Sequence, residues 1–186
     1  MQTDNTVYLL VGPRGSGKSH YTKDLVLRNP SLSVVSRDEI LIRRFGSTDT
    51  DPYSGCQYYV REIMYRLLRQ KLSMKTGVRL VLDTWTGSRD ERRDVIARLR
   101  RCGATRIIAL YLITPVESVK EWFWLKPGIA KIGEMSKKQG QGFVFFCEDA
   151  PERDYTLFHK LAKGIDSDGF DKVVRVNPLE PIIELE

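Results

Sequence analysis

Short apolar runs recur along the chain, separated by longer segments of mixed polarity. Thr6 to Val11 is a nearly continuous run of β-prone residues, which is typical of a strand buried on both faces of a parallel sheet. Comparable runs follow it at intervals. The pattern predicts five strands, at residues 6–11, 32–35, 78–82, 106–114 and 171–176.

Between these runs, apolar residues recur at the spacing of amphipathic helices. Helices are predicted over residues 18–28, 38–44 and 56–75, with a polar loop over 46–55. Ser88 and Glu91 have the spacing of a capping box. The helix that they open carries one apolar stripe, made of Val95, Ile96, Leu99 and Cys102. Pro115 opens a further helical stretch.

Strands that alternate with helices predict an α/β fold, a five-stranded parallel sheet with helices on both faces. We expect one domain spanning residues 1–186. The segment from Trp122 to Gly169 does not follow the alternation, because it combines an apolar run at 143–146 with lysines and glycines. We interpret residues 115–169 as a lid and an insertion.

Composition narrows the class of protein. The chain has 186 residues, 41% of them hydrophobic and 29% charged, which is close to the globular average and excludes a disordered or collagen-like chain. No apolar run approaches the ~20 residues of a membrane helix, and residues 1–5 do not resemble a signal peptide. The net charge of +6 is of the sign that polyanionic partners attract, the alternative being a surface charge that serves solubility alone.

Cysteine and histidine usage favours a reducing, cytoplasmic setting without a disulfide framework or a zinc site. The three cysteines, Cys56, Cys102 and Cys147, lie far apart, and we expect them to be small buried residues. Only two histidines are present, at positions 20 and 159. A histidine-based metal centre or charge relay is therefore not expected.

Residues 12–19 carry the clearest chemical signal. Their sequence, Gly-Pro-Arg-Gly-Ser-Gly-Lys-Ser, fits the phosphate-loop pattern in full, between a predicted strand and a predicted helix. Gly15 and Gly17 permit a backbone whose N–H groups form an anion-binding nest. Lys18 is expected to reach the β- and γ-phosphates of a nucleotide, ATP or GTP, and Ser19 to ligate Mg²⁺. The whole motif is Gly12, Pro13, Arg14, Gly15, Ser16, Gly17, Lys18 and Ser19. It makes the fold a three-layer P-loop NTPase sandwich.

Asp83 ends the apolar run Leu80-Val81-Leu82. In open α/β sheets, ligands bind at the carboxyl ends of the strands. Asp83 is therefore a second candidate ligand of Mg²⁺, the alternative being that it caps the following loop.

Arg37 and Asp38 follow the second predicted strand and belong to the same edge. Asp38 is a candidate general base for an attacking hydroxyl, and Arg37 could neutralise phosphate charge. Position alone leaves a second reading of equal weight, in which Asp38 is the N-cap of the helix that it opens.

Three blocks of residues between Val11 and Arg93 resemble the 5′-hydroxyl polynucleotide kinase family and the wider group of small P-loop kinases. They are Gly12 to Ser19, Ser36-Arg37-Asp38, and Leu82-Asp83-Thr84 followed by Glu91-Arg92-Arg93. The resemblance implies a kinase that moves the γ-phosphoryl group of ATP to a hydroxyl. It implies that Asp38 is the general base, and that Arg37 and Asp83 help to shape the acceptor site.

The chain departs from the family at positions near the acceptor. Leu41 stands where the family has an arginine that contacts the acceptor phosphate, with Arg43 and Arg44 the nearest replacements. Trp85 replaces an asparagine. The predicted lid has no arginine between residues 115 and 142, only Lys120, Lys126, Lys131, Lys137 and Lys138, and Arg153 follows in the insertion.

The aromatic and basic clusters could bind nucleic acid, or they could have an ordinary structural role in packing and on the surface. Trp122-Phe123-Trp124 could stack on bases, but we favour packing of a lid helix on the core. Tyr53, Tyr58 and Tyr59 pose the same question. Five arginines of the predicted helix after Ser88 are expected to form a solvated face: Arg92, Arg93, Arg98, Arg100 and Arg101.

Three functions follow from these observations. The first is an ATP-dependent kinase of a polynucleotide 5′-hydroxyl. The second is a kinase of a small molecule such as a nucleoside, sugar or antibiotic. The third is a nucleotide-binding protein without kinase turnover. The oligomeric state is not indicated.

Overall fold

A computed structural model describes residues 4–46, 48, 55–73, 76–126, 128–134 and 144–185. The predicted loop at 46–55, Tyr53, Lys137 and Lys138 fall wholly or largely outside these residues. Within them, no helix is both long enough and apolar enough to cross a membrane.

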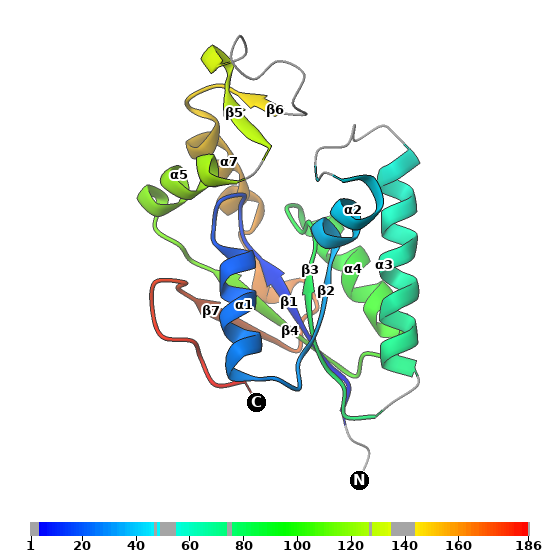
Figure 1. Cartoon of the computed structure of the whole chain (residues 1–186). Coiled ribbons are helices and arrows are strands. Elements are labelled where there is room, and N and C mark those ends of the chain that lie inside the picture. The colour runs from blue at the N-terminus through cyan, green and yellow to red at the C-terminus, as the bar shows by residue number, and fades with distance from the viewer. Residues whose placement is uncertain are drawn as a thin grey trace.

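The centre of the molecule is a parallel sheet of five strands in the order β2-β3-β1-β4-β7 (Figure 1). They are β1 (Thr6–Val11), β2 (Ser33–Ser36), β3 (Arg79–Asp83), β4 (Arg106–Leu112) and β7 (Lys172–Val176). All five were predicted, with ends within two residues. The fourth strand stops at Leu112 rather than Thr114, because Thr114 precedes a proline and its hydroxyl donates to the carbonyl of Ser16, 2.8 Å away.

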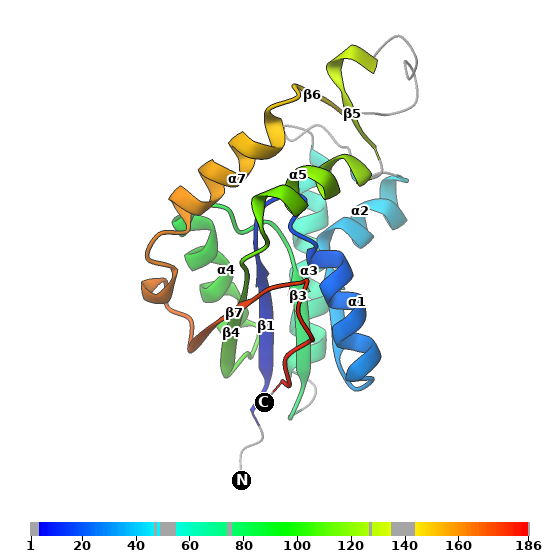
Figure 2. The same cartoon turned by 90° about the vertical axis from the view of Figure 1, so that its left-hand side faces the viewer.

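Helices cover both faces of the sheet, as predicted, and make a three-layer sandwich (Figures 1 and 2). They are α1 (Lys18–Arg28), α2 (Arg37–Phe45), α3 (Gly55–Ser73), α4 (Arg89–Arg101), α5 (Val116–Leu125) and α7 (Ala150–Leu161). A short parallel pair, β5 (Ile129–Lys131) and β6 (Val144–Phe146), lies in the expected insertion, beyond the end of the sheet where the phosphate loop is.

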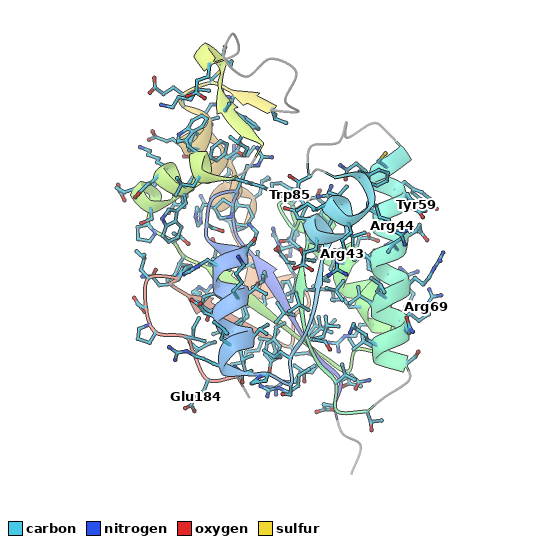
Figure 3. The ribbon with its side chains drawn as sticks, viewed as in Figure 1. Arg43, Arg44, Tyr59, Arg69, Trp85 and Glu184 are labelled. Carbon is cyan, nitrogen blue, oxygen red and sulfur yellow. The ribbon has the colours of Figure 1, made fainter. Side chains whose placement is uncertain are left out.

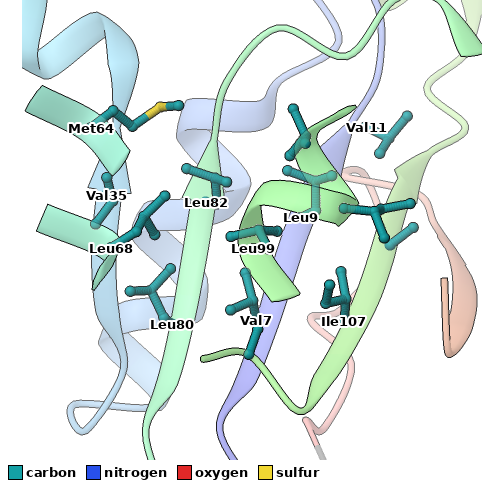
Figure 4. Packing of buried hydrophobic residues seen from close by; sticks show 14 of the residues in the cluster. Val7, Leu9, Val11, Val35, Met64, Leu68, Leu80, Leu82, Leu99 and Ile107 are labelled. Atoms are coloured by element: carbon teal, nitrogen blue, oxygen red, sulfur yellow. The ribbon is translucent and has the colours of Figure 1, made fainter. Parts of the chain in front are cut away.

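Side chains alternate between two apolar layers, because successive residues of a strand point to opposite faces. One layer joins Val7 and Leu9 to α3 and α4 (Figure 4), and Phe158 adds α7 to it. The other joins Tyr8 and Leu10 to Tyr21 and Leu25 of α1. The acidic C-terminal segment packs against this second layer through Ile182, Ile183 and Leu185.

The strand order decides where a ligand can enter. β1 and β3 are neighbours, but the helices that follow them, α1 and α4, lie on opposite faces of the sheet. A crevice therefore opens between the carboxyl ends of these strands, which is the usual ligand position in such sheets.

Two expectations about single side chains are wrong. Cys147 is exposed and Cys56 is half-buried, whereas Cys102 is buried as expected. Arg92 is fully buried rather than part of a solvated face. The remaining arginines of α4 are exposed or half-buried, as predicted.

Candidate active site

Residues 12–17 connect β1 to α1 in a tight turn around a concave backbone. Gly15 and Gly17 have φ angles of +79° and +83°, a left-handed conformation that favours glycine. Gly17 is the N-cap of α1 and provides no side-chain acceptor, and the first turn of the helix has no acidic residue. The first backbone N–H groups of α1 are therefore available to bind an external anion.

The helix α5 holds the loop in this shape. A Cβ atom on Gly15 would lie 2.9 Å from the carbonyl oxygen of Val119, and one on Gly17 would lie 2.9 Å from the Trp122 ring. Phe123 is fully buried under the loop and Arg14 lies over its ring. The packing interpretation of the aromatic run is confirmed for Phe123, whereas Trp122 lines a cavity.

The ammonium group of Lys18 folds back onto the loop. Its Nζ donates to the carbonyl oxygens of Gly12 and Pro13, at 2.8 and 2.7 Å. Desolvation lowers the pKa of Lys18 to about 8, although the nearby charges of Asp83 and Asp38 raise it. An incoming polyphosphate would compete with these carbonyls for the ammonium group.

Asp83 and Asp38 reach the same edge of the sheet from adjacent strands. In the parallel register, Ser36 pairs with Asp83, so the start of α2 lies beside the end of β3. Burial raises the pKa of Asp83, and the charge of Lys18 opposes this shift. A cation beside Asp83 would favour its ionised form.

Asp38 does not cap its helix. The N-cap of α2 is Ser36, whose Oγ accepts from the N–H of Glu39 at 3.3 Å, and the capping reading of Asp38 is therefore wrong. Its carboxylate instead accepts from Lys126 Nζ at 3.0 Å and from Arg37 Nη1 at 3.3 Å. Lys126 follows α5 directly, so this ion pair connects the expected lid to α2.

These groups line a cavity of about 1470 Å³, here called the loop cavity. Its walls include residues 14–19, Asp38, Asp83, Trp122 and Lys126. The size exceeds the usual range for a small-molecule site, so it has room for a nucleotide and for part of a second substrate.

A second cavity of about 470 Å³, here called the side cavity, lies between α3, α4 and the segment after β3. Arg37, Tyr58, Arg61 and Trp85 line it, and Arg14 lines both cavities. Figure 3 shows Trp85 between α2 and the α5 side of the molecule. Arg37 and Asp38 are adjacent in sequence and line different cavities.

The buried Arg92 fixes the segment that carries Trp85. Its guanidinium donates to the carbonyl oxygens of Thr86 and Gly87, at 3.3 and 2.8 Å, and to that of Leu161 at 3.0 Å. Its Nε lies 2.6 Å from the carboxylate of Asp168, which is also buried. The segment is thus tied to residues that lie 69 and 76 positions further along the chain than Arg92.

Several residues proposed as replacements for missing arginines lie elsewhere. Arg43 and Arg44 are exposed in the last turn of α2, on the outer surface (Figure 3), and line neither cavity. Arg153 pairs with Asp149 and also lines neither cavity. Leu41 is fully buried in the core.

Sequence reasoning missed Arg61 as a cavity residue and did not single out Lys126 among the lid lysines. Arg61 belongs to a run of basic positions along α3, and Lys126 is one of several lysines after Pro115. Only the packing of the elements distinguishes either residue from its neighbours.

The residues present fit a Mg²⁺ ion of the kind that nucleotides carry. Mg²⁺ keeps several waters and uses one or two protein ligands plus substrate phosphates. The hydroxyl of Ser19 and the carboxylate of Asp83 line the same cavity. No group of three or more His, Cys, Asp or Glu suited to a metal occurs in the described part of the chain.

The central strand, the phosphate loop and the helix after it define a P-loop fold of the kinase type. A family model described as an AAA domain matches residues 7–124, well over half of the chain, and the chain belongs to this family. No curated protein sequence matches the chain.

Solved structures with this fold include several kinases. A chain of the Pnkp1/Rnl/Hen1 RNA repair complex has a TM-score of 0.65 at 18% identity, over 88% of this chain and 47% of that chain. A fungal RNA kinase has a TM-score of 0.52 at 12% identity, over 99% and 78%. Shikimate kinase from Acinetobacter baumannii, in complex with shikimate, has a TM-score of 0.51 at 19% identity, over 95% and 86%. This chain spans about half the length of the RNA repair chain, and identities this low establish a shared fold alone.

Proposed function

We propose that this protein transfers the γ-phosphoryl group of ATP to a hydroxyl group, and that the acceptor is the 5′-hydroxyl of a polynucleotide. One observation carries the proposal. The carboxylate of Asp38 lines the same cavity as the phosphate loop, while the adjacent Arg37 lines the cavity beside it. A general base at that boundary lies between a bound triphosphate and an acceptor arriving from the side cavity.

The loop would bind the triphosphate through backbone N–H groups and Lys18. The ammonium of Lys18 already lies against the inner surface of the loop, where it hydrogen-bonds Gly12 and Pro13. Phosphate oxygens would replace those carbonyls and provide stronger, charge-assisted partners. Arg14 at the rim lies 3.4 Å from Asp154 and would have to leave it to reach the phosphates.

Ser19 and Asp83 are the residues that would hold Mg²⁺. When bound with the nucleotide, the ion neutralises charge on the phosphate oxygens. The proximity of Lys18 to Asp83 keeps one protein cation at the same place.

Asp38 would accept the proton of the acceptor hydroxyl. As this happens, the hydroxyl oxygen bonds to the γ-phosphorus, and the bond between that phosphorus and the oxygen bridging it to the β-phosphate breaks. ADP leaves with the electron pair of the broken bond. Lys126 and Arg37 each lie against one oxygen of Asp38, at 3.0 and 3.3 Å, so the acceptor hydroxyl has to compete with one of these cations.

A polynucleotide acceptor is supported by charge, by exposed aromatic rings and by resemblance. The chain carries a net charge of +6. Tyr58 and Trp85 are 62% and 49% exposed, and such rings can stack on bases. The sequence blocks resemble the polynucleotide kinase family, and two of the structures with this fold are named for RNA repair and RNA phosphorylation.

A small hydroxyl compound is the second candidate acceptor. Leu41 is buried, so α2 does not present the guanidinium that the polynucleotide kinase family uses there. The shikimate kinase structure shares the fold at a TM-score of 0.51.

Transfer of label from γ-labelled ATP tests both candidates. The acceptors are 5′-hydroxyl DNA and RNA oligonucleotides beside a panel of nucleosides, sugars and aminoglycosides. We expect label on the oligonucleotides, its loss in Asp38→Asn, and its retention in Asp90→Asn, which changes an exposed acid in the first turn of α4. Label on small compounds alone would establish the second candidate. No label on any acceptor, with ATP still bound, would contradict both.

A further inference from the structure

The charged groups that line the side cavity differ in whether they already have a partner. Three arginines and two acids line it, and both acids are already engaged. Glu91 accepts from the N–H and hydroxyl of Ser88 at 2.8 and 2.9 Å, and Asp94 accepts from Arg98 Nε at 2.8 and 3.0 Å.

Among the residues that the structure describes, Arg61 is the arginine of this cavity that has no acidic partner. Arg14 pairs with Asp154, and Arg37 pairs with Asp38 and donates to Gln57. Arg61 forms no ion pair with any residue that the structure describes. Its guanidinium lies 5.4 Å from the centre of the Tyr58 ring, a cation–π contact that leaves its N–H donors for an anion.

Trp85 provides an aromatic surface in the same cavity. Its indole packs against Gly87 so closely that a Cβ atom there would lie 2.5 Å from the ring. The carbonyl of Gly87 is held in turn by the buried Arg92. The ring is therefore positioned by the backbone, yet about half of its surface (49%) is open to solvent.

We propose that the side cavity binds the phosphate and the base of the acceptor's terminal nucleotide, with Arg61 contacting the phosphate and Trp85 stacking on the base. This inference rests on the proposed function, because it takes the reacting hydroxyl to lie at Asp38. Arg37 joins the two positions, since one of its Nη atoms lies 3.3 Å from Asp38 and the other donates to Gln57 in the cavity wall. An acceptor bound in this way is an anion with an aromatic ring, and a neutral sugar lacks both features.

Kinetics with matched acceptors test the phosphate contact. The acceptors are a nucleoside, its 3′-monophosphate, and a 5′-hydroxyl oligonucleotide. We expect Arg61→Gln to raise KM for the two phosphate-bearing acceptors about tenfold or more, the scale of one lost charge-assisted hydrogen bond. KM for ATP, and for the nucleoside, should stay the same. Arg66→Gln is the control, because Arg66 is exposed on the same helix and lines neither cavity.

An abasic acceptor tests the stacking contact. Trp85→Leu should raise KM for the oligonucleotide about tenfold and leave KM unchanged for an oligonucleotide whose first residue lacks its base. Equal effects on both acceptors would contradict the role of Trp85. An Arg61→Gln enzyme that prefers phosphate-bearing acceptors as strongly as wild type would contradict the role of Arg61.

Calorimetric binding of the nucleoside 3′-monophosphate separates this inference from the proposed function, because binding needs no turnover. If wild type transfers no phosphate but binds this probe, and Arg61→Gln alone weakens binding, the cavity is confirmed and the kinase proposal is wrong. If transfer occurs and the probe binds equally to wild type and to Arg61→Gln, the kinase proposal holds and the cavity assignment is wrong.

Discussion

The loop cavity and the side cavity lie next to each other and are built in opposite ways. The loop cavity owes its chemistry largely to the backbone of one continuous segment, residues 12–19, held by α5. The side cavity owes its chemistry to side chains from the loop, α2, α3, α4 and the segment after β3. A backbone site of this kind can stay constant while neighbouring side chains change. The comparison suggests that the fold determines which phosphate donor binds, and that the side chains of the surrounding elements determine which acceptor binds.

The largest expected effect on phosphate transfer comes from a change in the loop cavity. Lys18→Ala should abolish transfer, because the variant removes the ammonium group that lies against the inner surface of the loop, where it can stabilise charge on the γ-phosphate. Label transfer measures the loss, and circular dichroism with thermal unfolding shows that the fold is retained. If the variant keeps transfer within tenfold of wild type, the assignment of the phosphate loop as the donor site is wrong.

Arg92 tests how far the side cavity depends on distant packing. Arg92→Met leaves the buried Asp168 with one cation, the half-exposed Arg89, which lies 2.9 Å from its other oxygen. The loss should lower the free energy of unfolding by about 3 kcal/mol, the low end of the cost of breaking a buried ion pair. Urea unfolding measures the change. The neighbouring exposed Arg93→Met should change it by less than about 0.5 kcal/mol. The double variant Arg92→Met with Asp168→Leu should recover part of the loss, and equal destabilisation of the single and double variants would contradict an ionic origin.

Asp38 tests whether the two cavities have separate roles, because it lies in the loop cavity next to Arg37, which lines the side cavity. Asp38→Asn should reduce turnover roughly 10²-fold or more, the usual scale for a general base. The Kd for ATP, measured by calorimetry, should change little. A turnover near that of wild type would show that the acceptor chemistry is assigned to the wrong residue.

The smallest expected effect is a dependence of ATP binding on pH. Lys18 has a pKa of about 8 in the free protein, and a bound polyphosphate stabilises its charged form. Above pH 8 the free lysine is neutral, so binding has to take up a proton and the Kd for ATP should rise by up to about tenfold per pH unit. Calorimetry in two buffers of different ionisation enthalpy detects this proton uptake. The Lys18→Ala variant should lack it, and a flat Kd in wild type between pH 8 and 9 would contradict the shifted pKa.

The strands and the phosphate loop could be predicted because their signals are local. A buried parallel strand appears as a continuous apolar run, and the loop pattern lies between a strand and a helix. Residues 115–169 resisted prediction because β5 and β6 have three residues each, too few to show a period. The helix α5 was expected after Pro115, but its packing against Gly15 and Gly17 has no signature in the sequence.

The side cavity could not be predicted, because its residues matter only through their neighbours in space. Arg61 and Arg66 look alike in the sequence, yet only Arg61 lines the cavity. Arg92 was misplaced for the same reason. It lies in a charged run beside Arg93, and the aspartate that justifies its burial comes from the far end of the chain.

That aspartate also has a consequence for how the protein is made. Asp168 lies 76 residues after Arg92. It precedes β7, which is the last strand of the sheet to be synthesised. A nascent chain that has not yet reached Asp168 must either keep the Arg92 guanidinium hydrated or bury it without a counter-charge. The face of α4 that carries Arg92 therefore finishes packing late, after Asp168 has been brought to it by long-range loop closure. Chains truncated before Asp168 would be trapped in that unfinished state, even though every residue of the phosphate loop is already present.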